Sequence, residues 1–238
     1  HRNTEIAKVM YEQAVKLSYN SPWYTSNEPS AMLSKIISEY APGDLNNVFF
    51  TTGGSTAVES AIRFVHYYNN VKGRPEKKLI ISREDGYHGS TYLSASLNGK
   101  SRTSDWMNYA NEMIVKVSSP KPFRNLDNLT INQFEDKLIN EIENKIVSIG
   151  AKNIAAFIGE PVLASGGVIV PPKNYFKRVK QICKQNDILF ISDEVVTGFG
   201  RLGHIFSSEI EFEVIPDIIT FAKGVTSGYF PLGGMVVS

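Results

Sequence analysis

The sequence predicts an α/β protein built on a mostly parallel, doubly wound sheet. Three observations support this fold class. Short apolar runs rich in β-branched residues alternate with longer segments of helical periodicity. Several runs, such as 154–158 and 188–191, are almost uninterrupted apolar stretches, as expected of strands buried on both faces. Glycines and polar residues follow these runs at the points where the strands would end.

Each element follows from its own pattern. Apolar residues at helical spacing predict helices at 4–17, 31–40, 134–149 and 175–185, and a further helix carries Ala57, Val58, Ala61, Ile62 and Val65 on one face. Strands are predicted at 48–51, 79–81, 113–117, 154–158, 188–191, 218–221 and 233–238. The connection 97–112 is long and polar, so we expect it at a surface or near a site.

Composition excludes several classes of protein. The 238 residues are 42% hydrophobic, which is enough for a large core without a disulfide or metal, and no metal site is expected. Lys and Arg number 25 against 24 Asp and Glu, and this balance argues against nucleic-acid binding. A single cysteine, Cys183, fits a reducing, cytoplasmic compartment. No apolar run is long enough to span a membrane.

The two ends of the chain predict that it is an internal fragment, incomplete at both ends. It opens at His1, in text that already looks like the middle of a domain, and 233–238 resembles a strand that stops without a turn. The sequence contains no signal peptide pattern.

In an open α/β sheet, ligands bind beyond the carboxyl ends of the strands. The glycine-rich turn 52–57 leads from a strand into a helix, where free N–H groups suit a phosphate. Tyr87, Glu160, Asp193 and Lys223 follow four other strands. Each alone is a weak signal, because Tyr87 could be ordinary packing, Glu160 a salt-bridge carboxylate, Asp193 a cap and Lys223 a solvated side chain.

Taken together, these residues suit pyridoxal phosphate. The helix N-terminus near Ser55 would take its phosphate. A buried Asp193 would hold the proton on the pyridine nitrogen. Tyr87 and Val195 would cover the two faces of the ring. The aldehyde needs an amine, and we expect Lys223 to be buried there.

At this point the chain resembles the class III (ω-) aminotransferases, which are pyridoxal phosphate enzymes of fold type I. The matching segments cover essentially the whole chain in order: 49–59, 87–91, 159–162, 193–201, 216–219 and 222–229. The resemblance implies a lead-in helical segment at 1–43 and the cofactor-binding large domain at 44–238, with the small C-terminal domain outside the chain.

The resemblance also implies a role for each site residue. Gly54 and Ser55 would bind the phosphate, Tyr87 would stack on the ring and Val195 would cover its other face. Asp193 would pair with the pyridine nitrogen, Glu160 would support the site beside it, and Lys223 would bind the aldehyde covalently and act as the catalytic residue.

Departures from the family pattern narrow the expected subgroup. Members that resemble ornithine or γ-aminobutyrate aminotransferases carry a second acid where this chain has Ser165, and tend to have Gln at Val196. With Tyr87 in place of Phe, these differences favour the amine or ω-amino acid:pyruvate subgroup. Gly53 and Thr56 replace the usual Ser and Glu of the phosphate turn, which costs one hydroxyl contact.

The activity implied is ping-pong transamination from an amine or ω-amino acid to a 2-oxo acid such as pyruvate, by a protein that is a homodimer at full length. Two alternatives remain: another class III reaction, as in an aminomutase or decarboxylase, or a non-catalytic phosphate-binding domain. Because the groups that grip the substrate carboxylate would lie outside 1–238, we expect the fragment alone to be poorly active.

Overall fold

The computed structural model describes residues 2–99, 106–125 and 127–238. Its centre is a seven-stranded sheet in the order β1-β7-β6-β5-β4-β2-β3. The strands are β1 (Asn47–Thr51), β2 (Leu79–Arg83), β3 (Ile114–Val117), β4 (Ile154–Gly159), β5 (Leu189–Asp193), β6 (Ile218–Phe221) and β7 (Gly233–Val237). The pairs from β3 through β6 are parallel, whereas β7 is antiparallel to both β1 and β6. The predicted α/β fold with a mostly parallel sheet is confirmed.

The α-helices are α1 (Thr4–Lys16), α2 (Glu28–Tyr40), α3 (Gly54–Val71), α4 (Tyr92–Ser96), α5 (Ile131–Ile149) and α6 (Tyr175–Gln185). Helix α2 begins three residues earlier than predicted because the Asn27 side chain accepts from the Ser30 N–H and Pro29 fits the first turn. Helix α5 begins at a capping box between Thr130 and Gln133. The short helix α4 has too few residues to show a period, and the sequence did not predict it.

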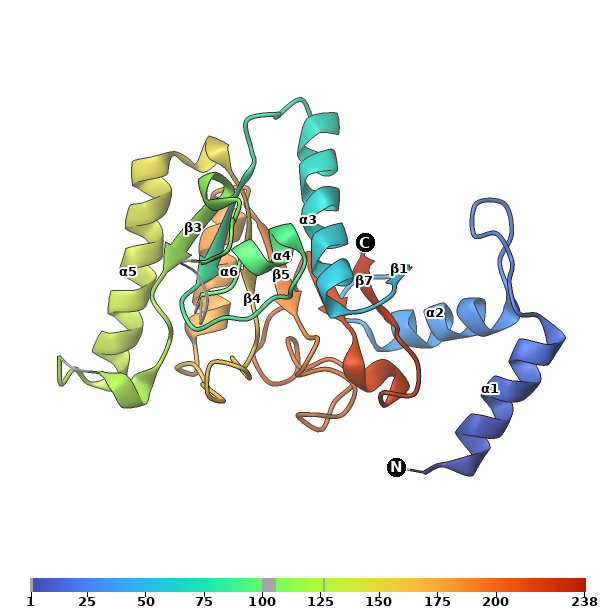
Figure 1. The fold of residues 1–238 in the computed structure, drawn as a ribbon. Helices are drawn as coiled ribbons and strands as arrows, with labels where there is room; N and C mark the ends of the chain where they lie inside the picture. Colours follow the sequence, from blue (N-terminus) through green and yellow to red (C-terminus); the bar gives the residue numbers. More distant parts are fainter. Residues whose placement is uncertain (1, 100–105, 126) are drawn as a thin grey trace.

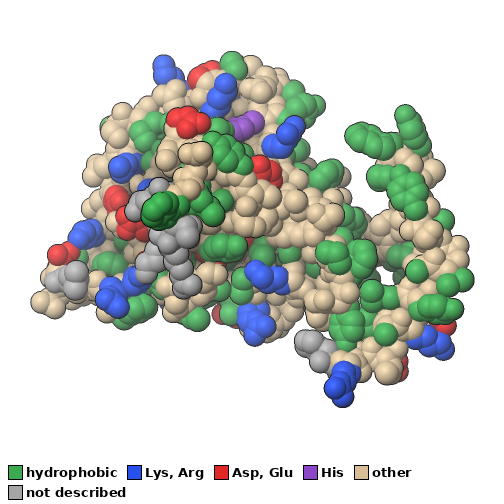
Figure 2. Space-filling view, viewed as in Figure 1, with side chains coloured by type: hydrophobic (Ala, Val, Ile, Leu, Met, Phe, Trp, Pro, Cys, Tyr) green, Lys and Arg blue, Asp and Glu red, His purple; other side chains and the backbone are tan. Residues whose placement is uncertain are grey.

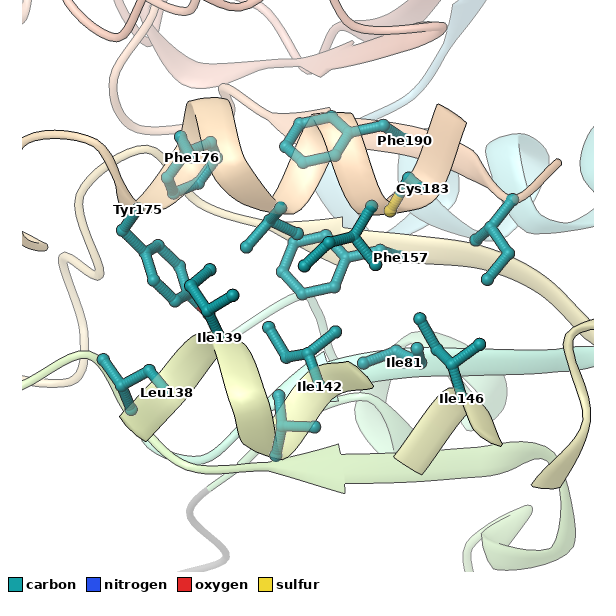
Figure 3. Close-up of a cluster of buried hydrophobic side chains, with 14 of the residues drawn as sticks. Ile81, Leu138, Ile139, Ile142, Ile146, Phe157, Tyr175, Phe176, Cys183 and Phe190 are labelled. Atoms are coloured by element: carbon teal, nitrogen blue, oxygen red, sulfur yellow. The ribbon is translucent and has the colours of Figure 1, made fainter. Parts of the chain in front are cut away.

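Helices cover both faces of the sheet (Figure 1). Helices α5 and α6 pack on one face over β2 to β5, where Phe157 and Phe190 stack with ring centroids 5.4 Å apart (Figure 3). Helix α3 packs on the other face through Val58, Ile62 and Val65. Burial on both faces explains why the central strands are apolar throughout.

The N-terminal segment extends away from this body (Figure 1). Helix α2 is anchored by the buried Ile37, which packs in a cluster with Phe221 of β6. Helix α1 buries none of its residues. The loop between them exposes Trp23 at 86% and Tyr24 at 92%, and Figure 2 shows apolar side chains gathered along this segment, which we call the N-terminal arm (residues 2–27).

No helix in the described parts of the chain combines the length and apolar character needed to cross a membrane.

Candidate functional site

The seven residues singled out from the sequence line one cavity of about 230 Å³. It lies where β2, β4 and β5 end and α3 begins. Its lining consists of Gly54, Ser55, Tyr87, His88, Gly89, Glu160, Asp193, Val195, Val196 and Lys223. The topology therefore brings together residues that are far apart in the sequence, as expected for the carboxyl edge of a parallel sheet.

The first N–H groups of α3 form one wall of this cavity. Its N-cap is Gly53, and among the described residues no side chain caps this helix end. The backbone at Gly54 lies close to Val195, since a Cβ built on Gly54 would sit 2.9 Å from Val195 Cγ1. The Ser55 hydroxyl accepts from the Ser90 N–H at 3.0 Å. An uncapped N-terminus of an 18-residue helix has free N–H groups that suit an anion such as phosphate.

Asp193, the last residue of β5, is a buried carboxylate with three donors nearby. Its Oδ2 lies 2.7 Å from Nδ1 of His88, which is also buried. Its Oδ1 accepts from the Val195 N–H at 3.1 Å and from the Thr220 hydroxyl at 3.2 Å. These contacts fix the carboxylate in an orientation that a buried acid could not hold alone.

Glu160 joins two loops at the side of the cavity. Its Oε1 accepts from the Tyr87 N–H at 2.9 Å, and its Oε2 accepts from the Ala164 N–H at 3.1 Å. Burial raises the pKa of Glu160 above its ordinary value, and the nearby Asp193 adds to this, while His88 and the Tyr87 N–H oppose it. Glu160 thus connects the Tyr87 and Ala164 backbones beside the cavity.

A buried arginine lies behind Glu160. The Arg83 side chain is fully buried, donates to the Glu160 carbonyl at 2.5 Å and packs over the Phe176 ring, 5.2 Å from its centroid. Burial lowers the pKa of Arg83, and the neighbouring Tyr175, Glu160 and Asp193 oppose that shift. The positive charge of Arg83 reduces the repulsion between the neighbouring Glu160 and Asp193 carboxylates.

The two residues expected to face a ring lie at the cavity. Tyr87 is 44% exposed and its backbone is held by Glu160. Val195 is half-buried beside Gly54. Their side chains therefore have room to contact a flat ligand placed between them.

Lys223 differs from the expectation of a buried amine, because its side chain is exposed at the mouth of the cavity. It begins the short 3₁₀ helix η5 (Lys223–Thr226) with φ of 48°, in the left-handed region that few non-glycine residues occupy. The following Gly224 is required by close packing, since a Cβ there would lie 2.8 Å from Cβ of Phe199. Such local strain is typical of functional positions.

A second cavity, of about 920 Å³, adjoins the first and shares Tyr87 and Gly89 with it. Asn98, Met107 and Tyr109 contribute to its lining. The predicted 97–112 connection thus borders the site at its two ends, while residues 100–105 lie outside the described residues.

Sequence reasoning did not assign three groups that the structure places at or behind the site, namely His88, Thr220 and Arg83. His88 directly follows Tyr87, and Thr220 is the polar residue of an otherwise apolar strand, so both left a weak signal.

Glu194 directly follows Asp193, but its side chain does not line the cavity. Its buried carboxylate accepts from the Ser207 N–H and hydroxyl, both at 2.7 Å, and from the Ser208 N–H at 3.0 Å.

Comparison with known proteins agrees with this geometry. The family model for class III aminotransferases matches residues 1–238, and the chain belongs to this family. It is 42% identical to a probable gamma-aminobutyrate transaminase 4 from Oryza sativa subsp. japonica, over 98% of this chain and 49% of the relative. It is 41% identical to a putrescine–pyruvate aminotransferase from Pseudomonas aeruginosa, over 92% of this chain and 48% of the relative.

A solved structure of an omega transaminase from Pseudomonas jessenii in complex with PMP superposes with a TM-score of 0.93 at 38% identity. The match covers 99% of this chain and 52% of that one. The chain thus spans about half the length of the relatives that it matches.

The cofactor of this family is pyridoxal phosphate, and the residues present fit it. The uncapped end of α3 suits its phosphate, and Gly54 lets this helix end pack closely against Val195 at the cavity. Asp193 is an oriented carboxylate for the pyridine nitrogen, and Lys223 supplies an amine at the cavity mouth.

Proposed function

We propose that the protein transfers an amino group from an amine or ω-amino acid to a 2-oxo acid, with pyruvate as the preferred acceptor, by a ping-pong mechanism. The observation that carries the proposal is the meeting of an anion site, an oriented buried carboxylate and a lysine in one cavity. A relative with 41% identity is named for the putrescine and pyruvate pair, which supports the acceptor. The chain has Ser165 where relatives resembling ornithine or γ-aminobutyrate aminotransferases carry a second acid. This difference supports an acceptor other than 2-oxoglutarate.

Each residue has a role in this proposal. Bound pyridoxal phosphate would supply an electron sink for the substrate carbon. Gly54 and Ser55 would hold the phosphate, Tyr87 and Val195 would contact the two faces of the ring, and Asp193 would keep the pyridine nitrogen protonated. In the proposal, Glu160 keeps the Tyr87 backbone in place.

Lys223 carries the proton transfer. Lys223 would hold the cofactor covalently through Nζ in the resting protein, and the same Nζ, once free, would accept a proton from the substrate carbon as a base and give that proton back as an acid. Exposure at the cavity mouth leaves that amine within reach of an incoming substrate.

We also propose that residues 1–43 form a lead-in segment, that 44–238 form the cofactor-binding domain, and that the whole protein is a cytoplasmic homodimer. The N-terminal arm supports self-association, because Trp23 and Tyr24 expose large apolar surfaces. Light scattering on the full-length protein should show a dimer that Trp23→Ser with Tyr24→Ser weakens. A stable dimer with both substitutions would exclude the arm as its interface.

Borohydride reduction followed by peptide mass spectrometry tests the central assignment. The full-length protein loaded with pyridoxal phosphate should carry the cofactor mass on the peptide that contains Lys223. Lys223→Ala should abolish this label and the absorbance near the visible edge, whereas the exposed Lys177→Ala should keep both. Labelling of another lysine would contradict the assignment.

Product analysis tests the reaction class. Amine and 2-oxo acid pairs should exchange their functional groups, with no turnover in the absence of an acceptor. Release of carbon dioxide, or isomerisation of a single substrate, would instead indicate a decarboxylase or aminomutase.

A further inference from the structure

Lys116, on β3, lies outside the cofactor cavity and gathers an unusual set of acceptors. Its Nζ lies 2.8 Å from the Ser82 hydroxyl and within hydrogen-bond distance of three consecutive backbone carbonyls, so three N–H donors are shared among four acceptors. These are the carbonyls of Ser96 at 3.2 Å, Leu97 at 2.6 Å and Asn98 at 2.9 Å. One ammonium group therefore ties the end of α4 to the edge of the sheet.

The local chemistry explains this arrangement. The last carbonyls of a helix have no partner within the helix, and a cation near them is favourable. Helix α4 has only five residues, so it cannot be stable without such contacts. Burial lowers the pKa of Lys116 to about 8, which leaves the group mainly charged at neutral pH.

The segment held by Lys116 in turn holds the loop that faces the cofactor cavity. The Asn98 side chain accepts from the His88 N–H at 2.6 Å and donates to the Gly89 carbonyl at 2.9 Å. The Gly99 N–H donates to the Gly86 carbonyl at 2.9 Å. Three hydrogen bonds thus join residues 98–99 to 86–89, the segment that carries Tyr87 and His88.

We propose that Lys116 is a positioning residue for the cofactor site. It fixes the carbonyls of 96–98, and through Asn98 it holds the 86–89 segment so that Tyr87 and His88 face the cavity. This inference rests on the proposed function, since positioning is useful only if 86–89 contacts a cofactor.

Lys116→Met tests the inference because it keeps the length of the side chain and removes the donors. Two quantities are measured on the full-length protein. The first is hydrogen exchange of peptides spanning 84–99 without cofactor, with peptides from β4 as reference. The second is the dissociation constant for pyridoxal phosphate, from absorbance titration.

The chain offers a matched control in Lys77. Lys77 is buried, whereas Lys116 is half-buried, and it too donates to carbonyls, those of Ile154 at 3.3 Å and Asp187 at 2.5 Å, at the amino ends of β4 and β5. Lys77→Met should lower stability without speeding exchange at 84–99 or weakening cofactor binding. It therefore separates positioning from a general loss of stability.

We expect Lys116→Met to speed exchange at 84–99 but not in β4, and to raise the cofactor dissociation constant about ten-fold, a scale usual for groups that orient binding residues. Asn98→Ala should give the same pattern, and the double variant should be little worse than Asn98→Ala alone.

Two outcomes would overturn the inference. In the first, Lys116→Met, like Lys77→Met, leaves exchange at 84–99 and cofactor binding unchanged. In the second, Asn98→Ala changes these two quantities and Lys116→Met does not. If the unmodified protein binds no pyridoxal phosphate, the proposed function fails, while the exchange experiment still decides whether Lys116 holds the 86–89 segment.

Discussion

Nδ1 of His88 lies 2.7 Å from Oδ2 of Asp193, and both side chains are buried. The contact joins the loop after β2 to the end of β5, across the intervening strand β4. A charge-assisted hydrogen bond in such surroundings is short and strong. His88 therefore orients the Asp193 carboxylate even when no ligand is bound.

His88→Ala should lower the turnover of an amine and pyruvate about ten-fold, because a hydrogen bond to a charged group contributes about 1.5–3 kcal/mol. Asp193 keeps the Val195 N–H and the Thr220 hydroxyl, so cofactor binding should persist. Steady-state rates at saturating cofactor provide the measurement. His66→Ala, which removes only a contact with the Lys78 carbonyl, is the control, and equal rates for the two variants would refute the prediction.

Gly54→Ala should weaken pyridoxal phosphate binding by about ten-fold, a loss of ~1.4 kcal/mol. The added Cβ would lie 2.9 Å from Val195 Cγ1, so Val195, which lines the cavity, would have to shift. Gly53→Ala is the matched control, because a Cβ there meets nothing within 4 Å and its extended backbone suits any residue. Cofactor titration should separate the two variants, and identical affinities would count against a tight phosphate cradle.

Glu194→Ala should destabilise the fold by about 3 kcal/mol or more, since it leaves the buried Ser207 and Ser208 N–H groups without acceptors. Urea unfolding measures the loss. Glu209→Ala, at an exposed site on the same loop, should change the free energy of unfolding by less than about 0.5 kcal/mol. Similar midpoints for both variants would show that the Glu194 contacts contribute little.

Cys183 should make stability fall at alkaline pH. Burial raises the pKa of its thiol from 9.0 to about 12. Between these values the unfolded chain loses the thiol proton while the folded chain keeps it, so the free energy of unfolding decreases as pH rises. The contribution of the protonated Cys183 thiol to the free energy of unfolding is complete below pH 9 and is lost towards pH 12.

Cys183→Ala removes this titration. The stability difference between the unmodified protein and the variant should therefore narrow by roughly 1 kcal/mol between about pH 8 and pH 10. Tyr175, whose pKa burial raises to about 12, stays protonated in the folded state of both proteins over this pH range. Urea unfolding at the two pH values measures the difference, and a constant gap would contradict the prediction.

Periodicity predicted most of the elements because strands such as β4 are buried on both faces and helices such as α5 on one. It could not predict the direction of β7, because a buried strand has the same apolar pattern whether it pairs parallel or antiparallel with its neighbours. Nor could it show α4, whose five residues depend on Lys116 rather than on their own pattern.

The meeting of Asp193 and Lys223 at one cavity was predictable, because both follow strands whose carboxyl ends lie at the same edge of the sheet. The supporting groups were not, because their function depends on distances that the chain order hides. His88 reaches Asp193 from the loop after β2, Thr220 reaches it from β6, and Arg83 reaches the Glu160 carbonyl from the end of β2. The exposure of Lys223 also depends on the surrounding structure and not on its own identity.

The pairing of β1 with β7 constrains the order in which the protein folds during synthesis. Strand β1 lies at the edge of the sheet, and β7 is its neighbour, so β1 stays without a partner until almost all of these residues have left the ribosome. At about 5–20 residues per second, that wait is roughly ten seconds or longer. The turn that leads from β1 into α3 is thus fixed last, and a nascent chain acquires its anion site only at the end of synthesis of this segment.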